Sequence, residues 1–178
     1  MKSAMNVYLK WSQIYGHMMN RFNLSYRYAT REDADKILYF IRELAIYEKM
    51  LDEVVATENE LEYWLFEKKT AEVIFAVVDN KEVGFALFFH NFSTFVGKAG
   101  LYLEDLFVLE AYRGQGIGKY LFQQLATIAL DRGCGRMEWC CLNWNQPSID
   151  FYLSLGAKAM DSWSTYRLTT TELQQLAK

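Results

Sequence analysis

Apolar side chains follow two different spacings along this chain, and the spacings divide it into helices and strands. Between Arg31 and Lys49 they recur every three or four residues, which is the period of an amphipathic helix. A second long helix is expected from Gly116 to Arg132. Short apolar or alternating stretches, typical of strands, occupy residues 25–30, 72–78, 82–90, 101–109 and 136–143.

Turn and capping residues mark where these elements begin and end. Thr30 with Asp33 has the spacing of a helix capping box, as does Thr57 with Glu60. The second pair predicts a short helix that ends near Glu67. Further signals predict a turn at residues 79–81, a loop at 91–100, a helix that starts at Pro147 and ends before Gly156, one or two strands within 157–169, and a tail helix capped by Thr170.

The element order is therefore strand, two helices, three strands, helix, strand, helix and strand. This order predicts an α+β fold with a mixed, mostly antiparallel central sheet that is flanked by helices. Residues 1–24 precede the first strand and are interpreted as an N-terminal extension. Residues 25–178 are numerous enough to form a single domain with its own core.

The composition changes this picture by excluding several kinds of protein. With 52% hydrophobic and 16% aromatic residues the chain is globular, and a net charge of −3 does not favour nucleic-acid binding. No apolar run reaches about 18 residues, the length that a membrane helix needs, so we expect no membrane partner. The three cysteines form no CxxC pair and only two histidines occur, which favours neither a zinc site nor another metal centre. Cysteines without a disulfide framework fit a cytoplasmic protein.

A cluster of glycines follows the strand at 101–109, where the second long helix begins. A strand, a glycine-rich turn and a helix N-terminus form an anion-binding arrangement, because the first amides of a helix lack intrahelical partners. A P-loop is excluded, since its spacing needs glycine at Arg113 and serine or threonine at Tyr120. The dinucleotide fingerprint is excluded because Lys119 stands where it needs a third glycine. The remaining pattern, Arg-x-x-Gly-x-Gly at residues 113–118, predicts a bound phosphate or pyrophosphate.

Four segments together resemble one enzyme family. They are residues 104–108 with 112–118, residues 144–152 with Gly156 and Ala157, residues 44–50, and residues 97–105. The pattern is similar to that of the GNAT acetyltransferases, and within them to the diamine (spermidine/spermine) and thialysine N-acetyltransferases, over residues 25–178. The resemblance implies the GNAT fold, acetyl-CoA as co-substrate without a metal, and a homodimer.

The resemblance implies roles for two side chains in the chemistry of acetyl transfer. Glu104 would take a proton from the attacking amine, directly or through water, and Tyr152 would protonate the departing thiolate. Strand alternation places Glu104 and Asp105 on opposite faces of their strand. From the residues alone, a structural salt bridge at the two carboxylates and an ordinary packing role for Tyr152 stay open.

Further residues are assigned to the two substrates by the resemblance. Those that would contact acetyl-CoA are Leu106, Phe107, Val108, Arg113, Gly114, Gln115, Gly116, Ile117, Gly118, Lys119, Asn145, Ser148 and Tyr152. Leu106 and Val108 would act through their backbone groups. The residues that would contact the acceptor are Tyr47, Glu48, Glu104 and Trp139, with Glu48 holding a distal ammonium. A solvated helix face is the alternative interpretation of Tyr47 and Glu48.

These observations lead to one expected function and several alternatives. We expect an N-acetyltransferase that moves acetyl from acetyl-CoA to a primary amine of a small cationic acceptor, such as a diamine or polyamine, by direct attack in a ternary complex. The alternatives are acetylation of thialysine or a lysine-like amino acid, acetylation of a protein amine, and a non-catalytic acyl-CoA-binding sensor. The sensor would need neither Glu104 nor Tyr152, and both are present.

Overall fold

The computed structural model describes residues 23–178, which belong to two compact units, Met1–Cys140 and Cys141–Lys178. Residues 1–22 of the predicted N-terminal extension lie outside the described residues. The first unit contains β1 (Leu24–Tyr28), η1 (Arg31–Asp33), α2 (Ala34–Glu48), η2 (Leu51–Glu53), α3 (Glu58–Leu61), η3 (Glu62–Glu67), β2 (Glu72–Val78), β3 (Lys81–Ser93), β4 (Lys98–Val108), η4 (Glu110–Tyr112), α4 (Ile117–Asp131) and β5 (Met137–Trp139). The second unit contains α5 (Gln146–Ser154) and α6 (Thr170–Leu176).

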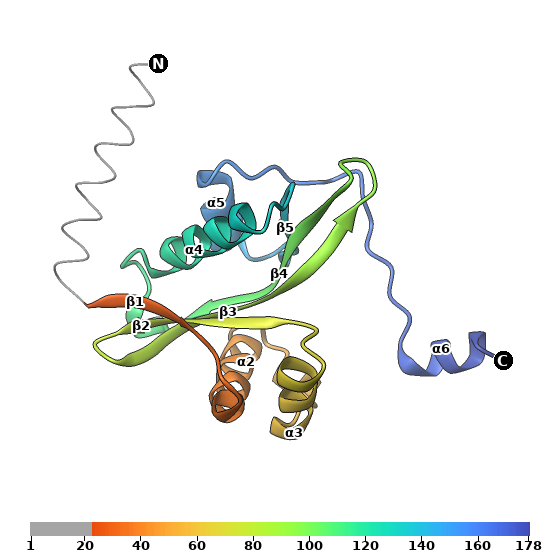
Figure 1. The fold of residues 1–178 in the computed structure, drawn as a ribbon, viewed down its shortest axis with the longest axis horizontal. Helices are drawn as coiled ribbons and strands as arrows, with labels where there is room; N and C mark the ends of the chain where they lie inside the picture. The colour runs from red at the N-terminus through yellow and green to blue at the C-terminus, as the bar shows by residue number, and fades with distance from the viewer. Residues whose placement is uncertain (1–22) are drawn as a thin grey trace, which may run out of the picture. The chain divides into compact units, whose positions relative to one another are not determined.

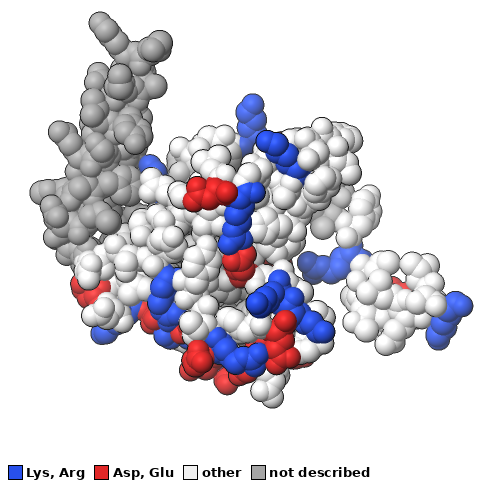
Figure 2. Space-filling view, viewed as in Figure 1, with Lys and Arg blue, Asp and Glu red and all other residues white. Residues whose placement is uncertain are grey.

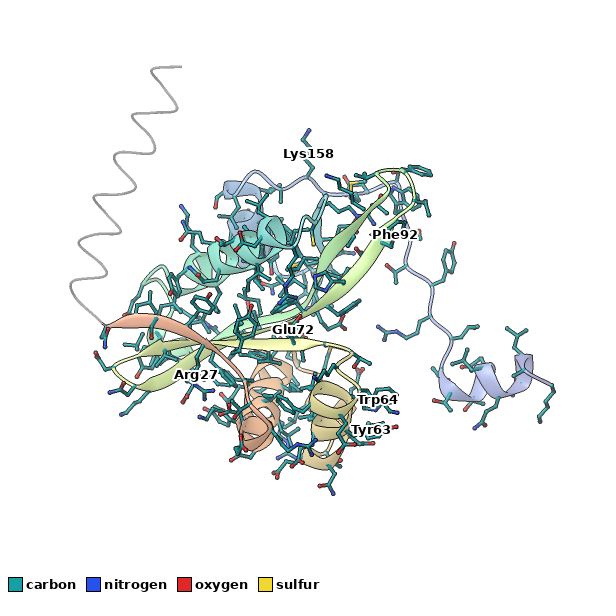
Figure 3. The ribbon with its side chains drawn as sticks, viewed as in Figure 1. Arg27, Tyr63, Trp64, Glu72, Phe92 and Lys158 are labelled. Carbon is teal, nitrogen blue, oxygen red and sulfur yellow. The ribbon has the colours of Figure 1, made fainter. Side chains whose placement is uncertain are left out.

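The strands of the first unit form one mixed sheet in the order β1-β2-β3-β4-β5 (Figure 1). Neighbouring strands are antiparallel from β1 to β4, and β4 pairs with β5 in parallel. The hairpin of β3 and β4 continues past the start of β2, and Phe92 near its tip is exposed (Figure 3). The predicted α+β fold with a mostly antiparallel sheet is confirmed.

Helices cover both faces of this sheet (Figure 1). On one face, α2 buries Ile37 and Phe40 against Phe75, Phe85 and Phe107 of the strands. The Phe40 ring stacks on the Phe85 ring with 5.3 Å between their centroids. On the other face, α4 packs against β2, β3 and β4. The core therefore holds the C-terminal part of β4, around Phe107, between α2 and α4.

Basic and acidic side chains are mixed around α2 and α3 (Figure 2). Arg27 of β1 contacts Asp33 and Glu82, each at 2.6 Å, and Lys36 contacts the same two carboxylates. The Arg27 guanidinium holds the pKa of Asp33 well below its usual range. This network joins β1, β3 and the start of α2, so these charges stabilise the fold.

Most predicted elements of the first unit are confirmed, although the strand expected at 136–143 is limited to Met137–Trp139, and the interpretation of residues 91–100 was wrong. Residues 91–100 are not a loop, because β3 continues to Ser93 and β4 begins at Lys98. The turn between them contains Gly97 with a φ of 69°. The helix expected at residues 57–67 is present as α3 followed by the π-helix η3.

The second unit contains the two predicted helices but not the predicted strands. Pro147 lies in the first turn of α5, and a capping box of Thr169 with Glu172 opens α6, so the cap is Thr169 and not Thr170. Residues 157–169 form no strand. A strand needs a paired edge and usually a buried face, and residues 158–178 are all exposed.

Between residues 23 and 178, no helix has both the length and the apolar character that crossing a membrane requires. In the same range, no group of three or more His, Cys, Asp or Glu side chains is arranged to hold a metal ion.

Candidate functional site

A β-bulge at Glu104 interrupts β4. Leu103 and Asp105 pair with adjacent residues of β3, so Glu104 has no partner on that strand. Because of this extra residue, Asp105 lies on the face of Leu87 and Phe107, which packs against α2. Glu104 is exposed in the bulge. The regular alternation that the sequence predicted for these two carboxylates is therefore broken between Leu103 and Asp105.

The bulge also changes which backbone groups point away from β3. Before it, the Leu101 amide donates toward β5, to the carbonyl of residue 136 at 3.0 Å. After it, the Leu109 amide donates to the carbonyl of Val83 in β3 at 2.9 Å. Because backbone groups alternate in direction along a strand, those of Leu106 and Val108 point to the other edge of β4, away from β3. β5 pairs with β4 only as far as Leu103, and within residues 23–178 no other strand pairs with that edge. The backbone groups of Leu106 and the amide of Val108 thus lie on an open strand edge, and the Val108 carbonyl accepts from Arg113 at 2.9 Å.

Glu48, Glu104 and Asp105 form what we call the acidic cluster. Glu48 is the last residue of α2, and burial raises the pKa of its carboxyl. Burial, reinforced by the charges of Glu104 and Glu48, raises the pKa of Asp105 from its ordinary 3.8 to about 7. No lysine or arginine of the described chain forms an ion pair with these three carboxylates. The cluster therefore brings three carboxyl groups together without a basic ion-pair partner among the described residues.

Asp105 was not predicted as a site residue. The sequence feature that could have indicated a role for Asp105 is its position next to Glu104 in an otherwise apolar strand. Its burial on the α2 face depends on the bulge and on the end of α2, and both are tertiary features.

The glycine loop connects β4 to α4 after η4. Gly114 and Gly116 have φ values of 72° and 77°, in the left-handed region that favours glycine. A Cβ at Gly114 would meet nothing within 4 Å, so the loop is open to a ligand there. Gly116 is the N-cap of α4 and Ile117 its first residue, and no side chain caps this helix. An open, glycine-rich helix N-terminus fits the pyrophosphate that the resemblance to acetyl-CoA enzymes implies.

Other predicted residues of the loop support its shape. Gln115 donates from Nε2 to the carbonyl of Ala111 at 3.2 Å, which braces the loop against η4. Gly118 and Lys119 lie in the first turn of α4. Phe107 is buried in the core beneath the loop, with 6% of its surface exposed. Its side chain is therefore a structural support for this end of β4.

Arg113 connects the loop to α2. Its Nε donates to the carbonyl of Val108 at 2.9 Å. Its guanidinium carbon lies 4.7 Å from the centre of the Tyr47 ring and 4.9 Å from the centre of the Phe107 ring. Tyr47 is in the last turn of α2, so the structure brings it together with Arg113 and with the acidic cluster.

Trp139 lies at the level of the bulge, because it pairs with Leu103 at the end of β5. Its ring packs edge-on against Phe122 of α4, with 5.1 Å between the centroids. Nearby, the hydroxyl of Tyr102 in β4 lies 3.2 Å from Sγ of Cys140, the residue that follows β5. This hydrogen bond, together with burial, raises the pKa of Tyr102 to about 12. The contact of Trp139 with the acceptor stays a prediction.

Asn145, Ser148 and Tyr152 belong to the second unit. Asn145 is the N-cap of α5, and its Oδ1 accepts a hydrogen bond from the Ser148 amide at 3.4 Å. Tyr152 is partly buried on α5, with its ring centroid 5.5 Å from that of Phe151. The roles of these three residues toward acetyl-CoA stay predictions.

A cavity of about 350 Å³ lies elsewhere in the first unit. It is lined by Tyr28, Ala29, Leu65, Phe66, Lys69, Ala71, Glu72 and Val73. Glu72 (Figure 3) is held there by Arg132, whose Nη2 lies 2.8 Å from Glu72 Oε2. None of the predicted site residues lines this cavity. The acceptor site is therefore not assigned to it.

Comparison with known proteins identifies the family of this chain. A profile described as "Acetyltransferase (GNAT) family" matches residues 38–157. The thialysine N-epsilon-acetyltransferase of Sus scrofa is 36% identical over 163 residues, which cover 85% of this chain and 95% of that protein. The L-ornithine N5-acetyltransferase of Arabidopsis thaliana is 43% identical over 95 residues, covering 53% of this chain and 42% of that protein.

A solved structure gives the same result for the fold. An integron cassette protein from the mobile metagenome of V. cholerae superimposes with a TM-score of 0.73 at 30% identity, covering 87% of this chain and 98% of that one. The GNAT fold predicted from the resemblance is confirmed by the family match together with this superposition. Members of the family use acetyl-CoA as co-substrate, which agrees with the open glycine loop. This chain therefore belongs to the acetyltransferase (GNAT) family and is an acetyl-transfer enzyme.

Proposed function

We propose that this enzyme transfers acetyl from acetyl-CoA to a primary amine of a small cationic acceptor, by direct attack in a ternary complex. The observation that carries the proposal is the acidic cluster, whose carboxylates have no basic ion-pair partner in the described chain. Two of them belong to β4, whose open edge begins at the bulge. A cation that enters the cluster gains charge-assisted hydrogen bonds, so a charged acceptor is favoured over a neutral one.

Acetyl-CoA is proposed to lie along the open edge of β4 and to reach the glycine loop. Amides of the loop and of the first turn of α4 would hold the pyrophosphate, helped by the helix dipole. The backbone of Leu106 and Val108 would hold the pantetheine arm and the thioester oxygen, whose charge grows in the transition state. The other proposed contacts are Phe107, Arg113, Gly114, Gln115, Gly116, Ile117, Gly118, Lys119, Asn145, Ser148 and Tyr152.

Two proton transfers accompany this reaction. The amine must lose a proton, and Glu104, exposed in the bulge, is the proposed base, acting directly or through water. Asp105 is a second candidate, because a pKa of about 7 suits a group that accepts a proton near neutral pH. Tyr152 is the proposed acid that protonates the thiolate of coenzyme A.

The pH dependence of kcat/KM distinguishes the two candidate bases. If Asp105 is the base, Asp105→Asn should remove the rise of kcat/KM around pH 7, and Glu104→Gln should keep it. If Glu104 is the base, Glu104→Gln should lower kcat about 100-fold or more, and Asp105→Asn should keep most of the rate. Tyr152→Phe should lower kcat in either case, because the thiolate then leaves without its proton.

The names of the relatives support an amine acceptor that carries a second polar or charged group. Relatives are named for thialysine, for L-ornithine and, in Homo sapiens, for spermidine/spermine. We propose that Glu48 holds a distal ammonium of the acceptor, with Tyr47 and Trp139 flanking its chain. Thialysine or another lysine-like amino acid, and a protein amine, are the alternative acceptors. A non-catalytic acyl-CoA sensor is the alternative outside acetyl transfer.

A thiol-release assay over a panel of amines tests the proposal. The panel contains 1,4-diaminobutane, spermidine, thialysine, lysine, a peptide with a free N-terminus, and butylamine as the singly charged control. The diamine should have a kcat/KM about tenfold above that of butylamine, because it gains a second charge-assisted contact. Binding of acetyl-CoA without turnover of any amine, with Glu104→Gln and Tyr152→Phe both silent, would identify a sensor instead.

We also propose a cytoplasmic homodimer built from one domain at residues 25–178, behind the extension at 1–24. Cys134, Cys140 and Cys141 are all free thiols, which suits a reducing compartment. The family match at residues 38–157 spans both compact units, which supports a single functional domain. Light scattering tests the dimer, which should have twice the chain mass of 20.9 kDa.

A further inference from the structure

The Arg113 side chain lies on the opposite side of the sheet from the helix that follows its own loop. The Gly84 face of β3 and β4, which includes Val108, approaches Leu121 of α4. The guanidinium instead lies over the rings of Tyr47 and Phe107, on the face covered by α2. One side chain therefore contacts the end of β4, the core below it and the last turn of α2.

These contacts suit the chemistry of an arginine, and they hold the C-terminal end of α2, which carries Tyr47 and Glu48. The planar guanidinium stacks on aromatic faces while its Nε donates in the plane to the Val108 carbonyl at 2.9 Å. Arg113 is exposed, so the attraction between its cation and each ring has the modest size typical of exposed sites, and the two rings and the hydrogen bond act together. Tyr47 precedes Glu48 directly, so an ordered Tyr47 also orders one carboxylate of the acidic cluster.

We propose that Arg113 is a positioning residue that couples the glycine loop to the acceptor side of the site. Acetyl-CoA that orders the loop would then order Tyr47 and Glu48 for the amine. The inference rests on the proposed function, and it gives the Arg113 side chain a role other than direct contact with the pyrophosphate. By linkage, the acceptor must strengthen acetyl-CoA binding by the same factor.

The first test compares two acetyl donors, acetyl-CoA and acetyl-pantetheine, which lacks the pyrophosphate. If Arg113 couples the loop to Tyr47, Arg113→Met should raise the KM for the amine about tenfold with acetyl-CoA, and less with acetyl-pantetheine, which has no pyrophosphate to order the loop. If Arg113 only binds the pyrophosphate, the variant should raise the KM for acetyl-CoA and leave the KM for the amine unchanged with both donors, which overturns the proposal. Arg113→Lys keeps the charge without the stacked fork, and should resemble Arg113→Met.

Two further variants control for charge and for the route of the coupling. Lys119→Met removes one charge from the first turn of α4, next to the loop, and should raise the KM for acetyl-CoA but not the KM for the amine. Tyr47→Leu should raise the KM for the amine, and adding Arg113→Met to it should have no further effect. Multiplicative effects of the two substitutions would overturn the proposal. Thermal melting confirms that each variant is folded.

Hydrogen exchange provides a measurement that needs neither acceptor nor turnover. Coenzyme A should slow amide exchange at residues 44–49, the end of α2, in the wild type and not in Arg113→Met. Equal slowing in both proteins would overturn the coupling even if the proposed reaction is correct. If no amine is turned over and the difference in exchange remains, the acceptor assignment is rejected and the coupling stands.

Discussion

In β4, a bulge of one residue determines the burial of two neighbouring carboxyl groups, and with it the pKa of one of them. Glu104 and Asp105 are adjacent in sequence, but the bulge leaves Glu104 exposed and places Asp105 on the face that packs against α2. Burial disfavours the charged form, so the pKa of Asp105 rises to about 7. At neutral pH its protonation state is therefore sensitive to any ion that binds nearby.

Asp105→Asn should raise the melting temperature at pH 8 and change it little at pH 4. Well below the ordinary pKa of 3.8 the group is protonated in the folded and in the unfolded chain, and at pH 4 the stability difference from its titration is still small. As the pH rises toward 7, the unfolded chain loses this proton first, and the free energy of unfolding falls. The amide removes that penalty. Equal shifts of melting temperature at both pH values would contradict this explanation.

Binding of a cationic amine should release protons near pH 7. An ammonium beside Asp105 favours its ionised form, so the pKa of Asp105 falls below about 7 when the amine binds. Calorimetry in two buffers of different ionisation enthalpy measures the protons released by the wild type. Asp105→Asn is the matched control and should release none. A wild-type binding heat that is independent of the buffer would show that the amine does not meet Asp105.

Helices and strands with a regular apolar pattern were predicted from the sequence, whereas the bulge in β4 was not. The sequence predicted α2 because its apolar residues recur every three or four positions, and Ile37 and Phe40 are indeed buried. It predicted β2 because that segment is a short apolar run, and most of its residues are buried. The part of the hairpin beyond residue 90 was not predicted, because asparagine is typical of loops. In the structure Asn91 lies in β3, and its Nδ2 donates to Glu138 Oε2 at 2.9 Å, a contact between residues far apart in the sequence. The glycine loop was predicted from spacing, whereas the stacking of Arg113 required the tertiary structure.

Gly84→Ala should destabilise the fold and weaken acetyl-CoA binding. A Cβ at Gly84 would lie 2.9 Å from the Phe107 carbonyl oxygen and 3.2 Å from Cγ2 of Val108. The first of these is backbone, so β4 must move, at a cost of about 1–3 kcal/mol. Val108 should shift with it and raise the KM for acetyl-CoA. Urea unfolding and steady-state kinetics measure the two effects.

Gly97→Ala provides the control for this prediction. Gly97 lies in the hairpin turn with a φ of 69°, so alanine there should cost stability through backbone strain. It should leave the KM for acetyl-CoA unchanged, because the turn is not part of the proposed site. An unfolding midpoint for Gly84→Ala equal to that of the wild type would show that β4 accommodates the methyl group freely.

Over the whole molecule, several acids that join elements of the fold are paired with basic side chains, whereas the proposed acceptor-binding acids are not. Asp33, Glu72 and Glu82 are held by arginines of neighbouring elements. The acidic cluster has no such partner among residues 23–178, and the net charge of the chain is −3. A cation approaching the molecule is therefore attracted most effectively where negative charge is left uncompensated.

The KM for 1,4-diaminobutane should rise more steeply with added KCl than the KM for butylamine. Salt shortens the screening length from about 10 Å at 0.1 M to about 3 Å at 1 M, and the diamine has two charges to screen instead of one. Glu48→Gln removes the carboxylate proposed to hold the distal ammonium, so it should raise the KM for the diamine and reduce its salt dependence toward that of butylamine. Equal KM changes for both amines would reject that role of Glu48, and salt-independent KM values would reject the acidic cluster as the acceptor site.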